Sequence, residues 1–538
     1  MRRGFCFVVC LLATLAGPPS AVSAASKPKL VVLLVVDQMR ADYVDLYGKN
    51  WKGGLARMFQ KGAYFTNAAY PYLQTITCAG HATLSTGAYP YAHGLIQNAW
   101  FDRDSGKNVA CTDDPTQPLV SYGTPVVGGD SPIRLMVPTL ADQMRSQLKP
   151  ASRVVSFSLK ARSAIMIAGH AADAVSWTDG GSLVTSKAFA EAPVEAIAQH
   201  IKAFPIDWEK IPSWTPMLPA AAYSFVDDGV AEATPKGWTR TFPHVLQAAN
   251  TLETMANWTR SPFADDYLAD MALQTTKTMK LGQTASTDYL AISFSVLDFV
   301  GHAFGPRSHE IQDVLARLDQ SLGRFFDGLD KVVGKDKYVV ALSADHGVAE
   351  LPEQTAPLGL PGGRIPFTQL RQTLEAAVTR ELGGQQNVRA MVYSDLYLVP
   401  GAYQKLLAKP GALDRVVAAL KTVPGVADAF HDVQLNKPSA LPKGTQRATA
   451  LSFYRGRSGD IVFVPKAGWM LADAGTTHGS TNGYDQRVPL VFMGAGIKAA
   501  KYTRNVSPAD LAPTLGQLIG VRLPKADGHA LPEVARRR

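Results

Sequence analysis

The 538-residue sequence has few cysteines, no internal repeat, no low-complexity tract and, after its first 24 residues, no apolar run long enough to span a bilayer. Its excess of positive charge is small, with 54 Lys and Arg against 45 Asp and Glu. Five of the basic residues lie at the two chain ends, so no clustered basic face is expected and no nucleic-acid partner is predicted. With 46% hydrophobic and 18% charged residues, the composition indicates an ordinary globular protein, either one large α/β domain with insertions or two domains.

The one long apolar stretch stands at the N-terminus. Arg2 and Arg3 precede a run from Phe5 to Ala16, and small residues follow up to Ala24. This order is typical of a secretory signal peptide, which we assign to residues 1–24. The mature chain, 25–538, is therefore expected in the periplasm or outside the cell, with no membrane attachment after cleavage. It is also expected to be a monomer.

Of the four cysteines, Cys6 and Cys10 leave with the signal peptide. Cys78 and Cys111 remain as an even pair in a protein sent to an oxidising compartment. Either they form a disulfide or they are two buried free thiols, and the sequence leaves both open.

Several short, unbroken apolar runs predict strands that are buried on both faces of a mainly parallel sheet. Ligands bind at the carboxyl ends of such strands, so polar residues that follow different strands can meet there. Three runs are followed by acidic or imidazole side chains: Leu30 to Val36 before Asp37, Tyr289 to Phe294 before Asp298, and Tyr338 to Leu342 before Asp345 and His346.

The rest of the chain divides around these runs. Apolar residues at spacings of three and four predict a helix from His309 to Val333, packed on the sheet. A stretch rich in Pro, Trp and Ala, about 176–262, is predicted to be an inserted lid. A stretch of alternating helical and strand-like segments, about 366–444, is predicted to be an inserted α+β cap.

The polar groups together predict a two-metal site. Carboxylates and imidazoles without a thiolate suit a catalytic Zn²⁺ site. A single Asp and His pair at a strand end is more often a helix cap or a hydrogen-bonded pair. Several such groups in this order favour metal binding. The candidates are Asp37, Thr77, Asp298, His302, Asp345, His346 and His478.

The segments around these residues resemble the alkaline phosphatase superfamily, and in detail its bacterial periplasmic alkaline phosphatases with a threonine nucleophile. The resemblance covers nearly the whole mature chain and follows the family's order. It rests on VVDQMRADY, TITCAGHATLSTG, HGLIQNAWFD, LKARSAIMIAG, LDFVGHAFGP, SADHGVAELPE and THGS. It implies an α/β core with a mostly parallel sheet flanked by helices, and two zinc ions per chain.

Carried over to these positions, the resemblance implies two ligand sets. One zinc would be held by Asp298, His302 and His478, and the other by Asp37, Thr77, Asp345 and His346. Thr77 would be the nucleophile and would form a phosphothreonine that water then hydrolyses. Thr75 is a rival nucleophile, and His81 is expected to support the site rather than bind metal.

The expected substrate class is inferred from three further residues. The resemblance implies that Asn98, Lys160 and Arg162 bind the phosphoryl oxygens, and the dianion of a monoester gains most from such cations. Small phosphate monoesters are therefore the predicted substrates. Ala99 stands where relatives often have a second asparagine, which would alter the support of Asn98. Two alternatives remain: a phosphodiesterase or nucleotide pyrophosphatase with the same zinc site, and a non-catalytic metal or phosphate binder.

Overall fold

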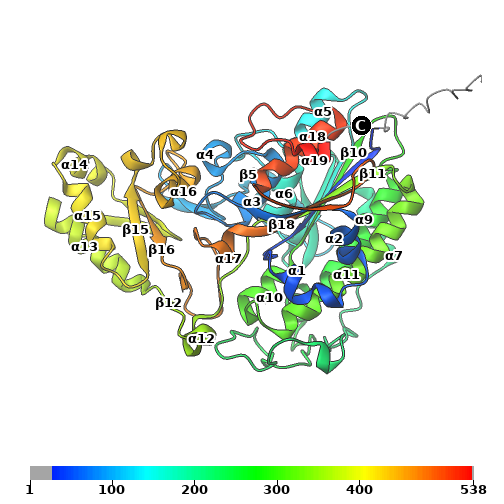
Figure 1. The fold of residues 1–538 in the computed structure, drawn as a ribbon, viewed down its shortest axis with the longest axis horizontal. Coiled ribbons are helices and arrows are strands. Elements are labelled where there is room, and N and C mark those ends of the chain that lie inside the picture. The colour runs from blue at the N-terminus through cyan, green and yellow to red at the C-terminus, as the bar shows by residue number, and fades with distance from the viewer. Residues whose placement is uncertain (1–26, 536–538) are drawn as a thin grey trace, which may run out of the picture.

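A computed structural model describes residues 27–535, so the predicted signal peptide lies outside the described residues. A mixed sheet of eleven strands forms the centre of the molecule (Figure 1). In spatial order its strands are β19 (Ala500–Val506), β2 (Ala63–Ala69), β18 (Arg487–Gly494), β11 (Tyr338–Ser343), β1 (Leu30–Val36), β10 (Asp288–Phe294), β7 (Val154–Ser158), β8 (Ala174–Asp179), β9 (Ser182–Ser186), β5 (Asp113–Ser121) and β6 (Gly129–Asp130).

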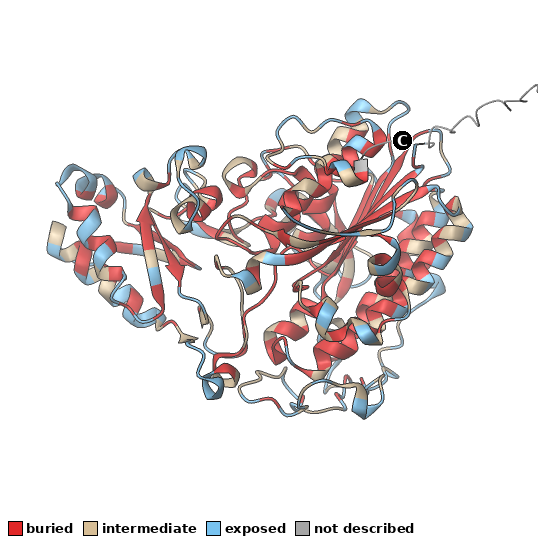
Figure 2. Ribbon diagram, in the orientation of Figure 1, coloured by how far each residue is buried: buried red, intermediate tan, exposed pale blue. Residues whose placement is uncertain are grey.

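The middle of this sheet is parallel. From β11 through β1, β10 and β7 to β8, each strand pairs in parallel with the next, whereas β18 pairs antiparallel with both of its neighbours. All seven residues of β1 are buried, as an unbroken apolar run predicts for a central strand. Figure 2 shows the same burial along the neighbouring strands. The expected α/β fold with a sheet between helices is confirmed; the sheet is parallel in its middle and mixed as a whole.

Helices cover both faces of the sheet. Alternate residues of β1 belong to two different apolar cores, because successive side chains of a strand point to opposite faces. One core includes α2 (Gly54–Lys61), α9 (Pro262–Thr278) and α11 (His309–Leu329); the other includes α3 (Thr77–Thr86), α5 (Leu140–Gln147), α6 (Ala161–Ala168) and α18 (Leu511–Ile519).

The long helix α11 lies where the sequence predicts it. It begins after Ser308, whose side chain accepts a hydrogen bond from the Ile311 backbone N–H, and one π-helical turn, Asp330–Gly334, follows it. Its large apolar residues recur at spacings of three and four and are buried, and the helix packs against α2 and α9. The helix therefore links β10 to β11 across one face of the sheet.

A smaller unit stands apart from the large sheet (Figure 1). Its four strands run in the order β13 (Val388–Val392), β14 (Asp395–Leu398), β16 (Ile461–Pro465) and β15 (Val426–His431). Three helices pack on them around a separate apolar core: α13 (Phe367–Leu382), α14 (Ala402–Ala408) and α15 (Ala412–Leu420). Strand β16 comes from beyond the 366–444 segment, and it completes this sheet by pairing with β14 and β15.

The segment between β9 and α9 has little regular structure apart from α7 (Glu195–Ala203) and α8 (Thr251–Thr259). Hydrogen bonds to the buried carboxylate of Asp313 on α11 hold part of it in place. The donors are Trp214 Nε1 at 2.7 Å and the Tyr223 hydroxyl at 2.6 Å. Its neighbours β8 and β9 belong to the large sheet, so the stretch from residue 176 begins within the sheet. Among residues 27–535, none of the helices is both long and apolar enough to cross a bilayer.

Candidate active site

All seven candidate metal ligands lie at the carboxyl edge of the central strands. Asp37 directly follows β1, and Asp345 and His346 follow β11. Asp298 and His302 are one turn apart on α10 (Val296–Phe304), the short helix after β10. Thr77 is the first residue of α3, and His478 lies in the loop before α17 (Gly483–Gln486).

One group of side chains surrounds His346. Its Nε2 atom is 3.2 Å from Asp345 Oδ2, 3.5 Å from Asp37 Oδ1 and 3.4 Å from the Thr77 hydroxyl oxygen. All four residues are buried. The ligand atoms of Asp37, Asp345 and His346 lie within 4.8 Å of one another, close enough for one metal ion.

A second group is centred on Asp298. Its Oδ1 atom is 3.2 Å from His302 Nε2 and 3.9 Å from His478 Nε2. The ligand atoms of Asp298, His478 and His346 also lie within 4.8 Å of one another, and the His346 and His478 rings stack at 3.5 Å. The two groups are therefore contiguous through His346.

The three histidines share one hydrogen-bond arrangement. In each, Nδ1 lies at hydrogen-bond distance from a backbone carbonyl: Thr476 for His302, Gly347 for His346 and Thr75 for His478. A carbonyl can only accept, so Nδ1 carries a proton, and Nε2 is the ring atom left to bind a metal ion. Because each Nε2 faces a carboxylate, the imidazoles are oriented as metal ligands usually are.

The electrostatics of the cluster also fit a cation. Burial, together with the nearby charges of Asp298 and Asp345, raises the pKa of Asp37 to about 7. Asp37 Oδ1 and Asp345 Oδ2 are buried and accept no hydrogen bond from the described residues. Three buried carboxylates lie close together, and each can supply an oxygen ligand beside the imidazole Nε2 atoms. The donor set therefore fits divalent metal ions such as zinc.

Gln38 links the two groups, although the sequence analysis did not single it out. Its backbone N–H donates to Asp345 Oδ1 at 3.1 Å, and its side-chain Nε2 donates to Asp298 Oδ1 at 2.6 Å. Its φ of 69° is unusual for a residue other than glycine. Gly301 makes room for it, since a Cβ there would lie 1.8 Å from Gln38 Oε1. No sequence pattern marks such a residue, because its role depends on two distant carboxylates.

Lys160 and Arg162 lie at the start of α6 rather than on an extended segment. Lys160 precedes the helix in extended conformation, and its ammonium group contacts both Asp37 and Asp298. Burial opposes its charge, but Asp298 and Asp37 raise its pKa above the usual value. Arg162 Nε is buried and has no hydrogen-bond partner among residues 27–535. Both cations therefore belong to the same end of α6, beside the carboxylate cluster.

The two candidate nucleophiles have different surroundings. The Thr75 hydroxyl is 3.2 Å from both the carbonyl oxygen and the backbone nitrogen of Ser480, so it donates to one and accepts from the other. The Thr77 hydroxyl faces His346 at the N-terminus of α3. His81, one turn later, contacts the Thr77 carbonyl and Asp345 through Nδ1. Gly80 allows this approach of α3, because a Cβ there would lie 2.3 Å from the Asp345 carbonyl.

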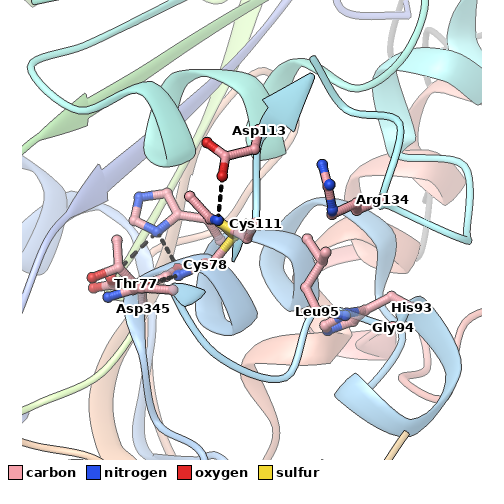
Figure 3. The surroundings of a disulfide bond; sticks show 12 residues. Thr77, Cys78, His93, Gly94, Leu95, Cys111, Asp113, Arg134 and Asp345 are labelled. Atoms are coloured by element: carbon pink, nitrogen blue, oxygen red, sulfur yellow. Dashed lines mark hydrogen bonds and ion pairs between the residues drawn. A yellow bond between two sulfur atoms is a disulfide. The ribbon is translucent and has the colours of Figure 1, made fainter. Parts of the chain in front are cut away.

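Asn98 is held against the start of the same helix. Its Oδ1 accepts a hydrogen bond from the Cys78 N–H at 2.9 Å, and its carbonyl accepts one from the Cys111 N–H at 2.9 Å. Cys78 and Cys111 are joined by a disulfide, and Figure 3 shows this bond directly beside Thr77 and Asp345. The disulfide therefore connects the Thr77 region to the segment that carries Asn98.

Residues 31–485 match the model of the type I phosphodiesterase / nucleotide pyrophosphatase family. Alkaline phosphatase PafA of Elizabethkingia meningoseptica is 33% identical, with 95% of each chain covered. Alkaline phosphatase PhoV of Synechococcus elongatus is 32% identical over 93% of this chain and 91% of its own.

Solved structures agree with these relatives. A crystal structure of wild-type alkaline phosphatase PafA superposes with a TM-score of 0.86 at 31% identity, covering 96% of this chain and 100% of that one. Murine ectonucleotide pyrophosphatase / phosphodiesterase 5 superposes with a TM-score of 0.50 at 13% identity, covering 93% of this chain and 96% of that one, so that likeness is one of fold alone.

Proposed function

Because the chain belongs to the type I phosphodiesterase / nucleotide pyrophosphatase family, we propose that its carboxyl-edge site is that of a two-zinc alkaline phosphatase with Thr77 as nucleophile. The chain hydrolyses phosphate monoesters, as its alkaline phosphatase relatives over nearly the whole length indicate. The observation that supports the mechanism best is the convergence of three imidazole Nε2 atoms, three carboxylates and the Thr77 hydroxyl.

The proposed ligand sets follow the two groups of the site. Asp298, His302 and His478 would hold one zinc, and Asp37, Thr77, Asp345 and His346 the other. Bound zinc would lower the pKa of the threonine hydroxyl and stabilise the attacking and leaving oxygens of an in-line displacement. Gln38 would hold Asp298 and Asp345 in register, and His81 would orient Asp345.

The chain's own residues would carry out the phosphoryl transfer. Thr77 Oγ attacks phosphorus, the bond to the alcohol oxygen breaks, and a phosphothreonine remains until water attacks it. The N-terminus of α3 favours the negative charge that gathers there. Since Asn98 Oδ1 accepts from the Cys78 N–H, its amide NH₂ is the group left to donate to a phosphoryl oxygen.

A solved variant of alkaline phosphatase PafA supports these assignments. That variant carries substitutions of a threonine, an asparagine, a lysine and an arginine. The same four residue types occur in this chain in the same order and at the same intervals: Thr77, Asn98, Lys160 and Arg162.

The preference for monoesters is proposed to depend on Lys160 and Arg162. A monoester dianion carries more charge on its nonbridging oxygens than a diester, so two cations there favour it. In the double variant Lys160→Ala with Arg162→Ala, hydrolysis of p-nitrophenyl phosphate should fall by orders of magnitude, while hydrolysis of bis-p-nitrophenyl phosphate changes little. An equal fall of both rates would remove the basis for this assignment.

A second candidate function is phosphodiester or nucleotide pyrophosphate hydrolysis at the same site, which the description of the matching family favours. The rates of the purified mature chain on the two nitrophenyl esters, with zinc measured on the same sample, separate the two. Strong preference for the monoester with about two zinc ions per chain is expected. Preference for the diester would reverse the order of the two functions.

The cellular location is also a proposal. A periplasmic or secreted monomer fits the predicted signal peptide at residues 1–24 and the disulfide between Cys78 and Cys111. N-terminal sequencing of the exported protein should begin near Ala25, and light scattering should give the mass of one chain.

A further inference from the structure

A cavity of about 650 Å³ lies at the same end of the large sheet as the metal ligands. The turn between β8 and β9 forms one wall, and α8, the start of α9 and the loop at residues 205–208 form the others. Its lining is mainly aromatic and aliphatic, and includes Leu252, Met255, Trp258, Tyr267 and Phe299. Its volume lies in the range of small-molecule sites.

Phe299 is a shared wall between this cavity and the carboxylate cluster. It follows Asp298 on α10, and the Lys160 ammonium nitrogen lies 4.8 Å from the centroid of its ring. Leu159, which also lines the cavity, directly precedes Lys160. A group within the cavity is therefore separated from the proposed phosphoryl-binding lysine by little more than one aromatic ring.

The cavity lining carries few charges. Its ionisable side chains, apart from two tyrosines, are Asp179 and Arg260. Leu252 is 65% exposed, so α8 brings an apolar side chain to the solvent boundary of the cavity. A lining of this kind gains free energy by binding apolar surface and has little to offer a sugar or a second phosphate.

We infer that this cavity binds the apolar organic group of a phosphate monoester whose phosphoryl group lies at Lys160. The inference rests on the proposed function, and it adds a substrate class: esters of hydrophobic alcohols are favoured over esters of small polar alcohols. The organic group passes the edge of the Phe299 ring, beside Leu159, to reach the cavity.

Straight-chain alkyl phosphates test the inference, because ethyl and hexyl phosphate have leaving groups of similar acidity and differ mainly in apolar surface. Each buried methylene contributes about 0.8 kcal/mol, roughly a fourfold change, so four partly buried methylenes should raise kcat/KM by at least about tenfold. Equal kcat/KM values for ethyl and hexyl phosphate in the wild type would overturn the inference.

A variant with charged side chains in the cavity tests whether the preference for hexyl phosphate arises there. In Leu252→Glu with Met255→Glu, the hexyl-to-ethyl ratio should fall to within about twofold of one, while kcat/KM for ethyl phosphate stays at the wild-type value. The matched control is Val245→Glu with Leu407→Glu, which adds the same charge at two exposed apolar positions outside the cavity and should keep the wild-type ratio. An unchanged ratio in the cavity variant would also overturn the inference.

Binding of hexylphosphonate and methylphosphonate, measured by calorimetry, gives a readout that does not depend on turnover. Hexylphosphonate should bind the wild type at least about tenfold more tightly than methylphosphonate, and the cavity variant should lose this difference. Failure of the proposed function is distinguishable: a zinc-loaded wild type that hydrolyses neither alkyl phosphate contradicts the phosphatase mechanism, whereas hydrolysis of both at equal rates contradicts only the cavity.

Discussion

At the residue scale, two threonines two positions apart have different partners. Thr75 is engaged with the backbone of Ser480, and Thr77 faces the ligand cluster. Residue type could not distinguish them, because both are threonines at or just before the start of α3, and only the family resemblance favoured Thr77. The surrounding backbone gives Thr75 a structural role and leaves the Thr77 hydroxyl toward His346.

We therefore expect Thr77→Ala to lose about three orders of magnitude or more in kcat on p-nitrophenyl phosphate, since it removes the attacking oxygen. Thr75→Ala should keep most of the activity and lose some stability. Steady-state kinetics and mass spectrometry of acid-quenched enzyme, which detects a phosphorylated peptide, provide the measurement. A Thr77→Ala enzyme as active as the wild type, with phosphate on Thr75, would reverse the assignment.

The hydrogen bonds of Gln38 lead to a second prediction about a single residue. Gln38→Glu replaces the N–H donor to Asp298 with a carboxylate that repels it, so the zinc dissociation constant should rise about 10- to 100-fold, as for other residues that orient metal ligands. Competition with a zinc chelator measures this constant without any substrate. Gln372→Glu, an exposed change of the same charge in the cap, is the control. Unchanged zinc affinity in Gln38→Glu would exclude the positioning role.

At the element scale, the site depends on how short helices leave the strands. Helix α10 places Asp298 and His302, and its first backbone N–H groups point at a carboxylate from α9. Asp265 accepts hydrogen bonds from the N–H groups of Ser295 at 3.2 Å and Val296 at 3.3 Å. The residue lies outside every motif, so only the packing of α9 on β10 reveals its contact with α10.

This contact predicts a pH dependence of stability. Burial raises the pKa of Asp265 from 3.8 to about 8, so the folded protein keeps a proton that the unfolded chain releases between these pH values. Its contribution to the free energy of unfolding is fully present below about pH 4. It is lost as pH rises through about 8, by at most about 1.4 kcal/mol per pH unit.

Asp265→Asn keeps one of the two acceptor oxygens and removes the titration. Urea unfolding of this variant between about pH 5 and pH 8 should therefore show a smaller fall in stability than the wild type shows. Asp104→Asn, an exposed change in a hairpin loop, should follow the wild type. Parallel curves for wild type and Asp265→Asn would show that the group does not titrate as argued.

The disulfide between Cys78 and Cys111 connects two elements that are 33 residues apart in the sequence. In the chain-entropy model, a cross-link of this span lowers the conformational entropy of the unfolded chain. It thereby raises the free energy of unfolding by about 3 to 4 kcal/mol. The double variant Cys78→Ser with Cys111→Ser should have a free energy of unfolding that is lower by roughly this amount, as measured by denaturant unfolding. Mass spectrometry of a non-reduced digest checks the bond itself, and two alkylatable thiols in the native protein would disprove it.

At the scale of the whole molecule, the proposed ions join distant parts of the chain. Asp37 comes from the first strand, Asp298 and His302 from the middle, and His478 from near the end. Ions that bind only the folded state stabilise it by mass action, by about 4 kcal/mol at a thousandfold excess over the dissociation constant.

Chelation should therefore abolish phosphatase activity and lower Tm, and zinc should restore both. Calorimetry and metal analysis on the same sample measure the two effects. In His302→Ala, which should weaken the Asp298 set alone, close to one zinc per chain is expected to remain. Full activity after complete removal of metal would contradict the two-zinc mechanism.

The sequence alone predicted three central strands, one long helix, the family and the type of reaction. Unbroken apolar runs predicted β1, β10 and β11 within a residue or two, and the spacing of three and four predicted α11, because these patterns reflect local geometry and burial. The family and the hydrolysis of phosphate monoesters were predicted from the motifs and are confirmed. The individual roles of the site residues stay predictions.

How the ligands meet, and which residues support them, depends on the packing of distant elements and was seen only in the folded chain. Gln38, Asp265 and the cavity beside Phe299 act through neighbours more than 20 residues away, and no local pattern encodes such contacts. The start of α6 also places Lys160 and Arg162 together at a helix end, because the helix begins directly after Lys160. Local sequence patterns specify elements, whereas the packing of those elements specifies the site.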